Sequence, residues 1–262
     1  MMLKEIRKED RLYLVCDEME KAGIKNCFTS KLGGESNGNI KGLNLGFRVG
    51  DEKENVEKNY KTVCRDMGFD FFKMTASRQT HTDNIRIVKS ADIGKGISKE
   101  SDFFDIDGLV CGEKNVPLVV YSADCFGVLL ADKNKKAVAA VHSGWRGTEK
   151  GIAAKAAEVM KNEFFVSPKD IVAAIGPGIG FCCFETEADT ACRFEKKYIV
   201  EKGDGKYLID LCAVIKDSLL GCGIKEENIH FSKRCTVCEN KIFYSYRSQK
   251  EKTGRMGAII SL

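Results

Sequence analysis

The sequence predicts a mixed α+β fold in which apolar strands form a sheet that is covered on both faces. Three closely spaced apolar runs, residues 116–121, 126–131 and 137–141, lack the polar alternation of a strand with one solvated face. Amphipathic helix patterns lie on both sides of these runs in the chain. No linker, internal repeat or low-complexity tract divides residues 1–262, so we expect a single domain.

The N-terminal part is expected to alternate short strands with turns around one long helix. Apolar runs predict strands over residues 12–16, 26–30 and 84–88. Glycines without a repeat period predict an irregular loop over residues 32–46, which is either functional or a surface excursion. Residues 51–67 have acidic side chains at the start, apolar side chains at helical spacing and a glycine after the end, which predicts a helix.

The C-terminal part continues the mixture of strands and helices. After Thr148, apolar residues recur on one face of a predicted helix that reaches Phe164. The remaining predicted elements are a buried strand at 171–175, helices at 185–197 and 210–220, and a terminal strand at 258–262.

Charge and cysteine usage narrow the class of protein. Basic and acidic residues number 42 and 38, and the small excess is not gathered into a stripe, which argues against nucleic acid as a partner. The first ten residues are too charged for a signal peptide, and no apolar run approaches the roughly 18 residues of a membrane span. We therefore expect a cytoplasmic protein whose twelve cysteines are mostly reduced.

Three residues at strand ends form the candidate chemical centre. His81, Cys125 and His142 each stand beside a turn rich in small or polar residues. Two imidazoles and one thiolate would hold a zinc ion and leave its fourth position open for water. Their spacing is not a motif, so two other interpretations stay open: a Cys125 nucleophile with His142 as its base, or ordinary core and turn residues. His230, the third histidine, is assigned to structure.

Several motifs occur together and carry a resemblance. They are Gln-Thr-His at 79–81, Ala-Asp-Cys at 123–125, His-Ser-Gly-Trp-Arg-Gly at 142–147, Ile-Gly-Pro-Gly-Ile-Gly-Phe-Cys-Cys at 175–183, Tyr-Ser-Tyr-Arg at 244–247 and Thr-Gly-Arg at 253–255. From about residue 27 to the C-terminus, the chain resembles the YfiH/YlmD laccase-domain family. The resemblance implies a four-layer α/β/β/α sandwich and places zinc on His81, Cys125 and His142.

The resemblance also implies activity. The family is associated with purine nucleoside phosphorolysis and adenosine deamination, has an older label as a copper polyphenol oxidase, is related to cysteine hydrolases and is implicated in peptidoglycan editing. A multicopper oxidase needs about ten histidines, whereas this chain has three. The H-x-E and P-C-x-x-C pattern of zinc nucleobase deaminases is also absent. The resemblance thus implies a zinc-dependent purine nucleoside phosphorylase with adenosine deaminase activity, acting on adenosine, inosine and methylthioadenosine, by a site unlike that of the zinc nucleobase deaminases. A cysteine hydrolase and adventitious copper oxidation are the alternatives.

Phosphorolysis of a small-molecule nucleoside needs an anion site. The candidates are four cationic side chains, with the amides of residues 176–180 as a second option: Lys31, Arg146, Arg247 and Arg255. Lys31 stands where the family usually has arginine, and lysine lacks the guanidinium fork that binds phosphate through two hydrogen bonds. For each of these residues, a structural ion pair is the alternative.

Other polar residues are candidates for the base, the ribose or proton transfer. Gln79 and Asn44 are expected to bind base or ribose, or else to stabilise turns. Asp124 is expected to orient a metal ligand or to act as an acid or base. Trp145 either stacks on a purine or packs in the core.

Cys235 and Cys238 form a CxxC pair. The pair would be half of a structural zinc site, but the sequence indicates no second pair. We therefore expect a reduced turn.

Overall fold

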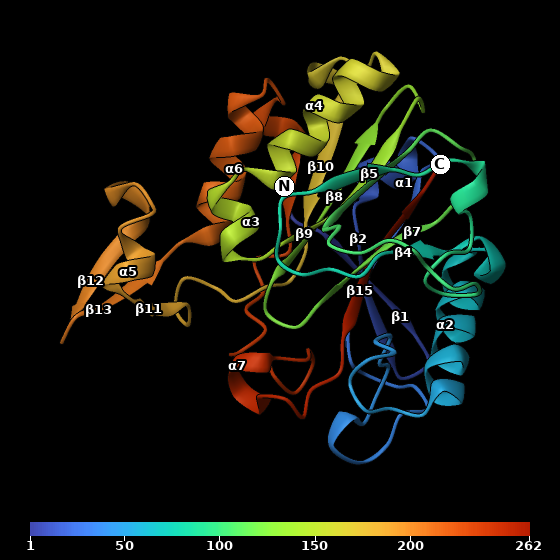
Figure 1. The fold of residues 1–262 in the computed structure, drawn as a ribbon, viewed down its shortest axis with the longest axis horizontal. Helices are drawn as coiled ribbons and strands as arrows, with labels where there is room; N and C mark the ends of the chain where they lie inside the picture. The colour runs from blue at the N-terminus through green and yellow to red at the C-terminus, as the bar shows by residue number, and fades with distance from the viewer.

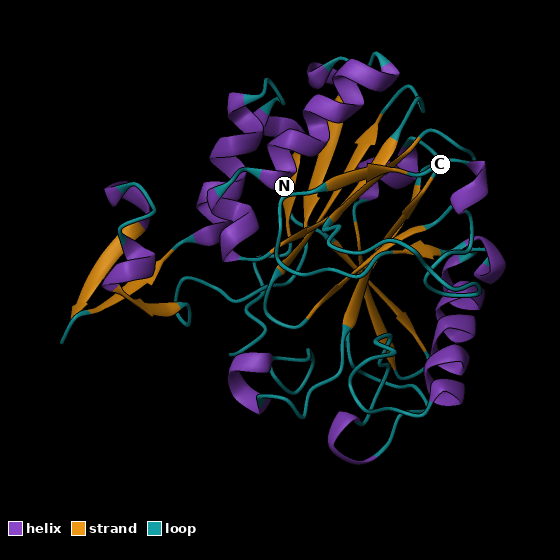
Figure 2. Cartoon of the chain, in the orientation of Figure 1, coloured by secondary structure: helices purple, strands orange, loops and turns teal.

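The computed structural model describes residues 1–262 and contains two six-stranded sheets that pack face to face (Figure 1, Figure 2). In spatial order, the first sheet consists of β1 (Lys4–Lys8), β2 (Arg11–Val15), β3 (Lys25–Thr29), β15 (Met256–Ser261), β7 (Leu118–Ser122) and β4 (Thr75–Ala76). The second consists of β14 (Ile229–Phe231), β10 (Ile171–Ile175), β8 (Phe126–Asp132), β9 (Val138–Ser143), β6 (Gly108–Cys111) and β5 (Ile85–Ile87).

Helices cover the outer faces of the two sheets. The helix α2 (Lys53–Met67) packs on the first sheet, and α4 (Ile152–Phe164) and α6 (Leu211–Gly221) pack on the second (Figure 1). Shorter helices are α1 (Asp17–Lys21), α3 (Trp145–Glu149), α5 (Ala188–Ala191) and α7 (Tyr246–Gln249). Single 3-10 turns occur at Gly38–Ile40, Phe71–Lys73, Ser90–Asp92, Pro168–Asp170, Lys196–Tyr198 and Glu226–Asn228. No helix has both the length and the apolar composition of a membrane span.

Three hydrophobic cores separate these layers. Along β9, Ala139 and Val141 face the core under α4 and α6, whereas Val138 and Ala140 face the core between the sheets. A third core lies between α2 and the outer face of the first sheet. Because β9 is buried on both faces, its sequence is a continuous apolar run, and the predicted α+β class with covered sheets is confirmed. The three apolar runs do not share one sheet, since β7 belongs to the first sheet and β8 and β9 to the second.

The predicted helix at 185–197 is wrong. Residues Glu185–Glu187 form β11, only α5 is helical, and the segment ends in a 3-10 turn. The backbone of β11 pairs with β13 (Lys206–Ile209), which also pairs with β12 (Ile199–Gly203). The apolar residues whose spacing suggested a helix still pack into the core under α6, although most of the segment is not helical. This three-stranded sheet and α5 stand at one side of the main body (Figure 1).

Candidate active site

The three proposed ligands come from two sheets and meet at one point. His81 follows β4 of the first sheet, Cys125 directly precedes β8, and His142 lies in β9. Because β8 and β9 are antiparallel neighbours with Gly127 opposite His142, Cys125 and His142 are brought to the same end of the second sheet. The candidate ligand atoms of the three residues lie within 4.8 Å of one another.

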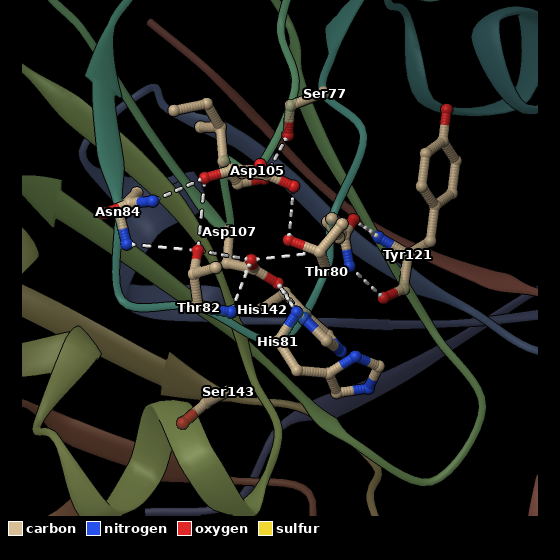
Figure 3. A network of polar contacts seen from close by, with 12 residues as sticks. Ser77, Thr80, His81, Thr82, Asn84, Asp105, Asp107, Tyr121, His142 and Ser143 are labelled. Carbon is tan, nitrogen blue, oxygen red and sulfur yellow. Dashed lines mark hydrogen bonds and ion pairs between the residues drawn. The ribbon is translucent and has the colours of Figure 1, made fainter.

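A buried carboxylate holds two of these residues in place (Figure 3). Asp107 precedes β6, which pairs with β9, so its carboxylate lies 2.7 Å from Nδ1 of His142. It also accepts hydrogen bonds from the backbone N–H groups of Thr80 (3.1 Å), His81 (3.1 Å) and Thr82 (2.8 Å), and from the Thr82 hydroxyl (2.8 Å). The contact to Nδ1 leaves Nε2 of His142 for a metal. The sequence offered one weak signal for Asp107, a carboxylate at the start of an apolar run.

The charges of the site are strongly coupled. Burial would raise the pKa of Cys125, but His142 and His81 lower it from 9.0 to about 6. Burial would lower the pKa of His142, but the Cys125 thiolate and Asp107 raise it to about 9. Burial would likewise raise the pKa of Asp107. Hydrogen bonds to His142 and Thr82 outweigh this effect and lower the pKa to about 2. Without metal, the centre is therefore a thiolate–imidazolium pair near neutral pH.

A cavity of about 1040 Å³ opens beside the three residues. This volume is just above the usual range for small-molecule sites, about 300–1000 Å³, and accommodates a nucleoside. Besides the three ligands, its wall includes five of the residues singled out in the sequence: Gln79, Asp124, Trp145, Arg247 and Arg255.

Three predicted substrate-binding residues lie outside the cavity wall, each with its polar group near a local partner. The Nζ of Lys31 donates to the carbonyl of Asn240. The side-chain amide of Asn44 makes hydrogen bonds to the backbone of Gly46 and Arg255 and to the carboxylate of Asp51. The guanidinium of Arg146 lies 4.3 Å from the Trp145 ring centroid.

The glycine-rich turn at 176–180 does not form the expected anion-binding nest. Its N–H groups already donate within the chain: Gly176 to Gly127 O, Gly178 to Arg234 O, Ile179 to Asp124 O and Gly180 to the sulfur of Cys235. Donors occupied in this way do not bind a phosphate.

Asp124 and Gln79 line the cavity but are anchored to the chain. The carboxylate of Asp124 accepts from the Thr236 hydroxyl (2.7 Å) and from the backbone N–H of Arg247 (2.6 Å), and makes no hydrogen bond to a histidine. The amide of Gln79 makes two hydrogen bonds to the backbone of Tyr121. Both residues therefore position other parts of the wall.

The cavity wall contains cations that sequence reasoning missed. Arg48, Lys53 and Arg78 line it together with Arg247 and Arg255. Arg48 and Arg78 are exposed, and their guanidinium groups make no hydrogen bond within the chain, although that of Arg78 lies over the ring of Phe104. No local motif marks these positions, because they reach the cavity only through the path of the loops that carry them.

Comparison with known proteins identifies the family of the chain. The family model described as "Multi-copper polyphenol oxidoreductase laccase" matches residues 25–262. The chain belongs to this laccase family.

Family relatives of known name and structure cover nearly the whole chain. A Geobacillus stearothermophilus protein named "Purine nucleoside phosphorylase YlmD" is 32% identical, over 97% of this chain and 96% of its own length. A Bacteroides thetaiotaomicron relative named "Purine nucleoside phosphorylase" is 30% identical, over 90% of each. The crystal structure of Bacillus licheniformis hypothetical protein YfiH aligns with a TM-score of 0.92 at 30% identity, over 99% of this chain and 98% of that one. The resemblance to YfiH/YlmD proteins is thus confirmed.

We expect Asp107→Asn to weaken metal binding about 10- to 100-fold, because the amide places N–H groups where donors already converge and loosens His142. Chelator competition on the purified protein measures this affinity. Asp105→Asn, at an exposed neighbouring carboxylate, is the control and should bind metal as the unmodified protein does. Equal affinities for both variants would contradict a role for Asp107 in holding the ligand.

We expect Gly144→Ala to reduce metal occupancy, because the new Cβ would lie 2.9 Å from Cδ2 of His81 and 3.1 Å from Sγ of Cys125. Gly221→Ala is the matched control, since a Cβ there meets no atom within 4 Å. Metal analysis after dialysis distinguishes the two variants. Full occupancy in Gly144→Ala would contradict the expectation that this Cβ crowds the metal site.

In metal-free protein, the alkylation rate of Cys125 by iodoacetamide should rise with a midpoint near pH 6, because His142 and His81 stabilise the thiolate. Mass spectrometry of the Cys125 peptide measures the rate, with Cys125→Ser as the blank. Zinc should suppress the reaction. A midpoint at the ordinary value of 9.0 would disprove the thiolate–imidazolium pair.

Proposed function

We propose that the chain is a zinc-dependent purine nucleoside phosphorylase that also deaminates adenosine. The observation that carries the proposal is a His, Cys, His donor set beside a large cavity whose wall contains several arginines. The names of relatives that span at least nine-tenths of this chain support the same substrate class. Adenosine and inosine are the proposed nucleosides, with phosphate or water as the acceptor.

The donor set suits zinc at His81, Cys125 and His142. Two nitrogens and one sulfur are the ligands of a catalytic zinc site with one open position. Gly144 supports this fit, because a side chain there would fill the space between His81 and Cys125. When bound, zinc would supply Lewis-acid polarisation of an oxygen and an acidified water. Copper is the alternative metal, but three histidines do not build a multicopper centre.

Arg255 is the proposed centre of phosphate binding. Its Nη1 donates to the carbonyls of Thr253 and Gly254, and its other guanidinium nitrogens make no hydrogen bond within the chain. Burial lowers the pKa of Arg255, which the nearby Cys125 thiolate opposes. A partly buried guanidinium with unused donors favours an oxyanion, and Arg48 and Arg78 add positive charge at the cavity.

The rest of the cavity fits a nucleoside. Trp145 and Tyr246 offer aromatic faces for the purine. In phosphorolysis, a phosphate oxygen bonds to C1 of the ribose as the bond from C1 to the purine nitrogen breaks. In deamination, water adds at C6 and ammonia leaves. We propose that Asp124 acts by positioning Arg247, since hydrogen-bond donors occupy both oxygens of its carboxylate.

The experiment is a nucleoside panel assayed with and without phosphate. Base release from inosine should require phosphate, and ammonia release from adenosine should not. Cys125→Ala and His142→Ala should lose both activities together with the metal of this centre. Cys192→Ala, at an exposed cysteine away from the cavity, is the control. Full turnover by a Cys125→Ala protein that lacks this metal would refute the proposal.

The role of Arg255 in phosphate binding is tested with Arg255→Lys, which keeps the positive charge but loses the guanidinium fork. Its KM for phosphate should rise about tenfold, equivalent to about 1.4 kcal/mol. Arg7→Lys, on the exposed edge strand β1, is the control. An unchanged KM for phosphate in Arg255→Lys would remove this residue from the anion site.

One observation favours a second candidate, a cysteine hydrolase acting on an amide such as a muropeptide. Cys125 lies beside His142, whose ring is oriented by Asp107, which is the arrangement of a nucleophile, a base and an orienting acid. Zinc bound to the thiolate would suppress this chemistry. Amide cleavage by metal-free protein that zinc abolishes would favour the hydrolase, and nucleoside turnover that needs zinc would exclude it.

A further inference from the structure

Four cysteines outside the active site converge on one point. The sulfur atoms of Cys182, Cys183, Cys235 and Cys238 all lie within 4.8 Å of one another. The sulfur of Cys238 is 3.6 Å from that of Cys182 and 3.5 Å from that of Cys183. In a tetrahedral zinc site with Zn–S bonds of about 2.3 Å, neighbouring sulfurs are about 3.8 Å apart. We propose that these residues form a second metal centre, a structural zinc bound by four thiolates.

The fold brings the two cysteine pairs together. The first pair lies in the turn after β10 and the second in the turn after β14, and these strands are parallel neighbours. Their carboxyl ends therefore meet at one edge of the sheet. A β-bridge between Gly178 and Cys235 continues this pairing, with Thr236 N–H donating to Gly178 O at 3.0 Å. The cysteines of the CxxC turn are free thiols, as expected, but the pair is not isolated, because a second pair from a distant segment lies beside it.

The backbone around Gly180 accommodates the sulfur atoms of the cluster and donates a hydrogen bond to one of them. The backbone N–H of Gly180 donates to the sulfur of Cys235 at 3.2 Å, and such a hydrogen bond supports a metal-bound thiolate. A Cβ at Gly180 would lie 3.1 Å from Cβ of Cys235 and 3.3 Å from the sulfur of Cys182. Only glycine allows this close approach without displacing the sulfurs.

The geometry distinguishes a single zinc ion from other uses of four cysteines. None of the four is in a disulfide. An iron–sulfur cluster spreads its thiolates over several irons, whereas these sulfurs are close enough to share one ion. Four protein donors close a tetrahedral site and leave no position for substrate, so the centre is structural.

A metal bound by the four cysteines would stabilise one wall of the active-site cavity. Phe184, next to the first cysteine pair, lines the cavity, as does Arg247. The guanidinium of Arg247 donates to the carbonyls of Cys183 (3.0 Å) and Glu185 (3.2 Å). Thr236, inside the CxxC pair, donates to Asp124. The second zinc would therefore fix the segments that position Asp124 and Arg247.

Metal counting tests the proposal without any assay of turnover. The full chain, purified under reducing conditions and loaded with zinc, should hold two zinc ions. Cys182→Ser with Cys238→Ser should hold one, and Cys125→Ala should hold the other one. Cys192→Ser, at an exposed cysteine outside the cluster, should keep two. One zinc per chain that disappears in Cys125→Ala would overturn the proposal, as would iron at the four-cysteine site.

X-ray absorption of the unmodified, zinc-loaded protein makes the test independent of variant folding. Two filled sites should give an average of between two and three sulfur ligands per zinc, because one site has four thiolates and the other has one. An average of one sulfur per zinc would mean that only the active site binds metal. These readouts stand whether or not the protein cleaves nucleosides.

Discussion

The buried carboxylate of Asp107 is the constraint on which the site depends. A buried charge is stable only when hydrogen bonds and opposite charge compensate its lost hydration, and five donor contacts converge on this carboxylate. Those donors come from the loop after β4 and from β9, so one side chain joins the two sheets at the point where the candidate ligands meet. His81 is held there with a left-handed backbone (φ 66°), a conformation that its neighbours must enforce.

The part of the cavity wall that contains Arg247 depends on a second carboxylate, that of Asp124, which is also held by hydrogen bonds. Asp124 also has a left-handed backbone (φ 91°), and its oxygens receive hydrogen bonds from residues far along the chain. Strained residues thus lie next to or within the ligand set, where the surrounding hydrogen bonds compensate their cost. The four-cysteine cluster lies behind this wall, so the precision of the active site depends on contacts well outside it.

The electrostatics of the centre explain how one constellation supports competing chemistries. A thiolate paired with an imidazolium is a nucleophile when metal is absent, whereas a thiolate and a neutral imidazole are the forms in which these residues would bind zinc. Metal binding must displace the proton that His142 holds, so occupancy and protonation are linked. The arginines of the cavity keep its wall positively charged in either state.

Local sequence patterns are sufficient to predict the classes of element and to select the three candidate ligands. Apolar runs reveal strands buried on both faces because burial acts on every residue, and the motifs around His81, Cys125 and His142 are local enough to be recognised. The predicted helix at 185–197 failed because its backbone pairs with a strand some twenty residues away. Three further features appear only in the folded chain. Asp107 contacts His142, two distant cysteine pairs meet, and three candidate residues, Lys31, Asn44 and Arg146, lie outside the cavity wall. These are consequences of strand order and register, which bring together residues whose separation in the chain leaves no local pattern.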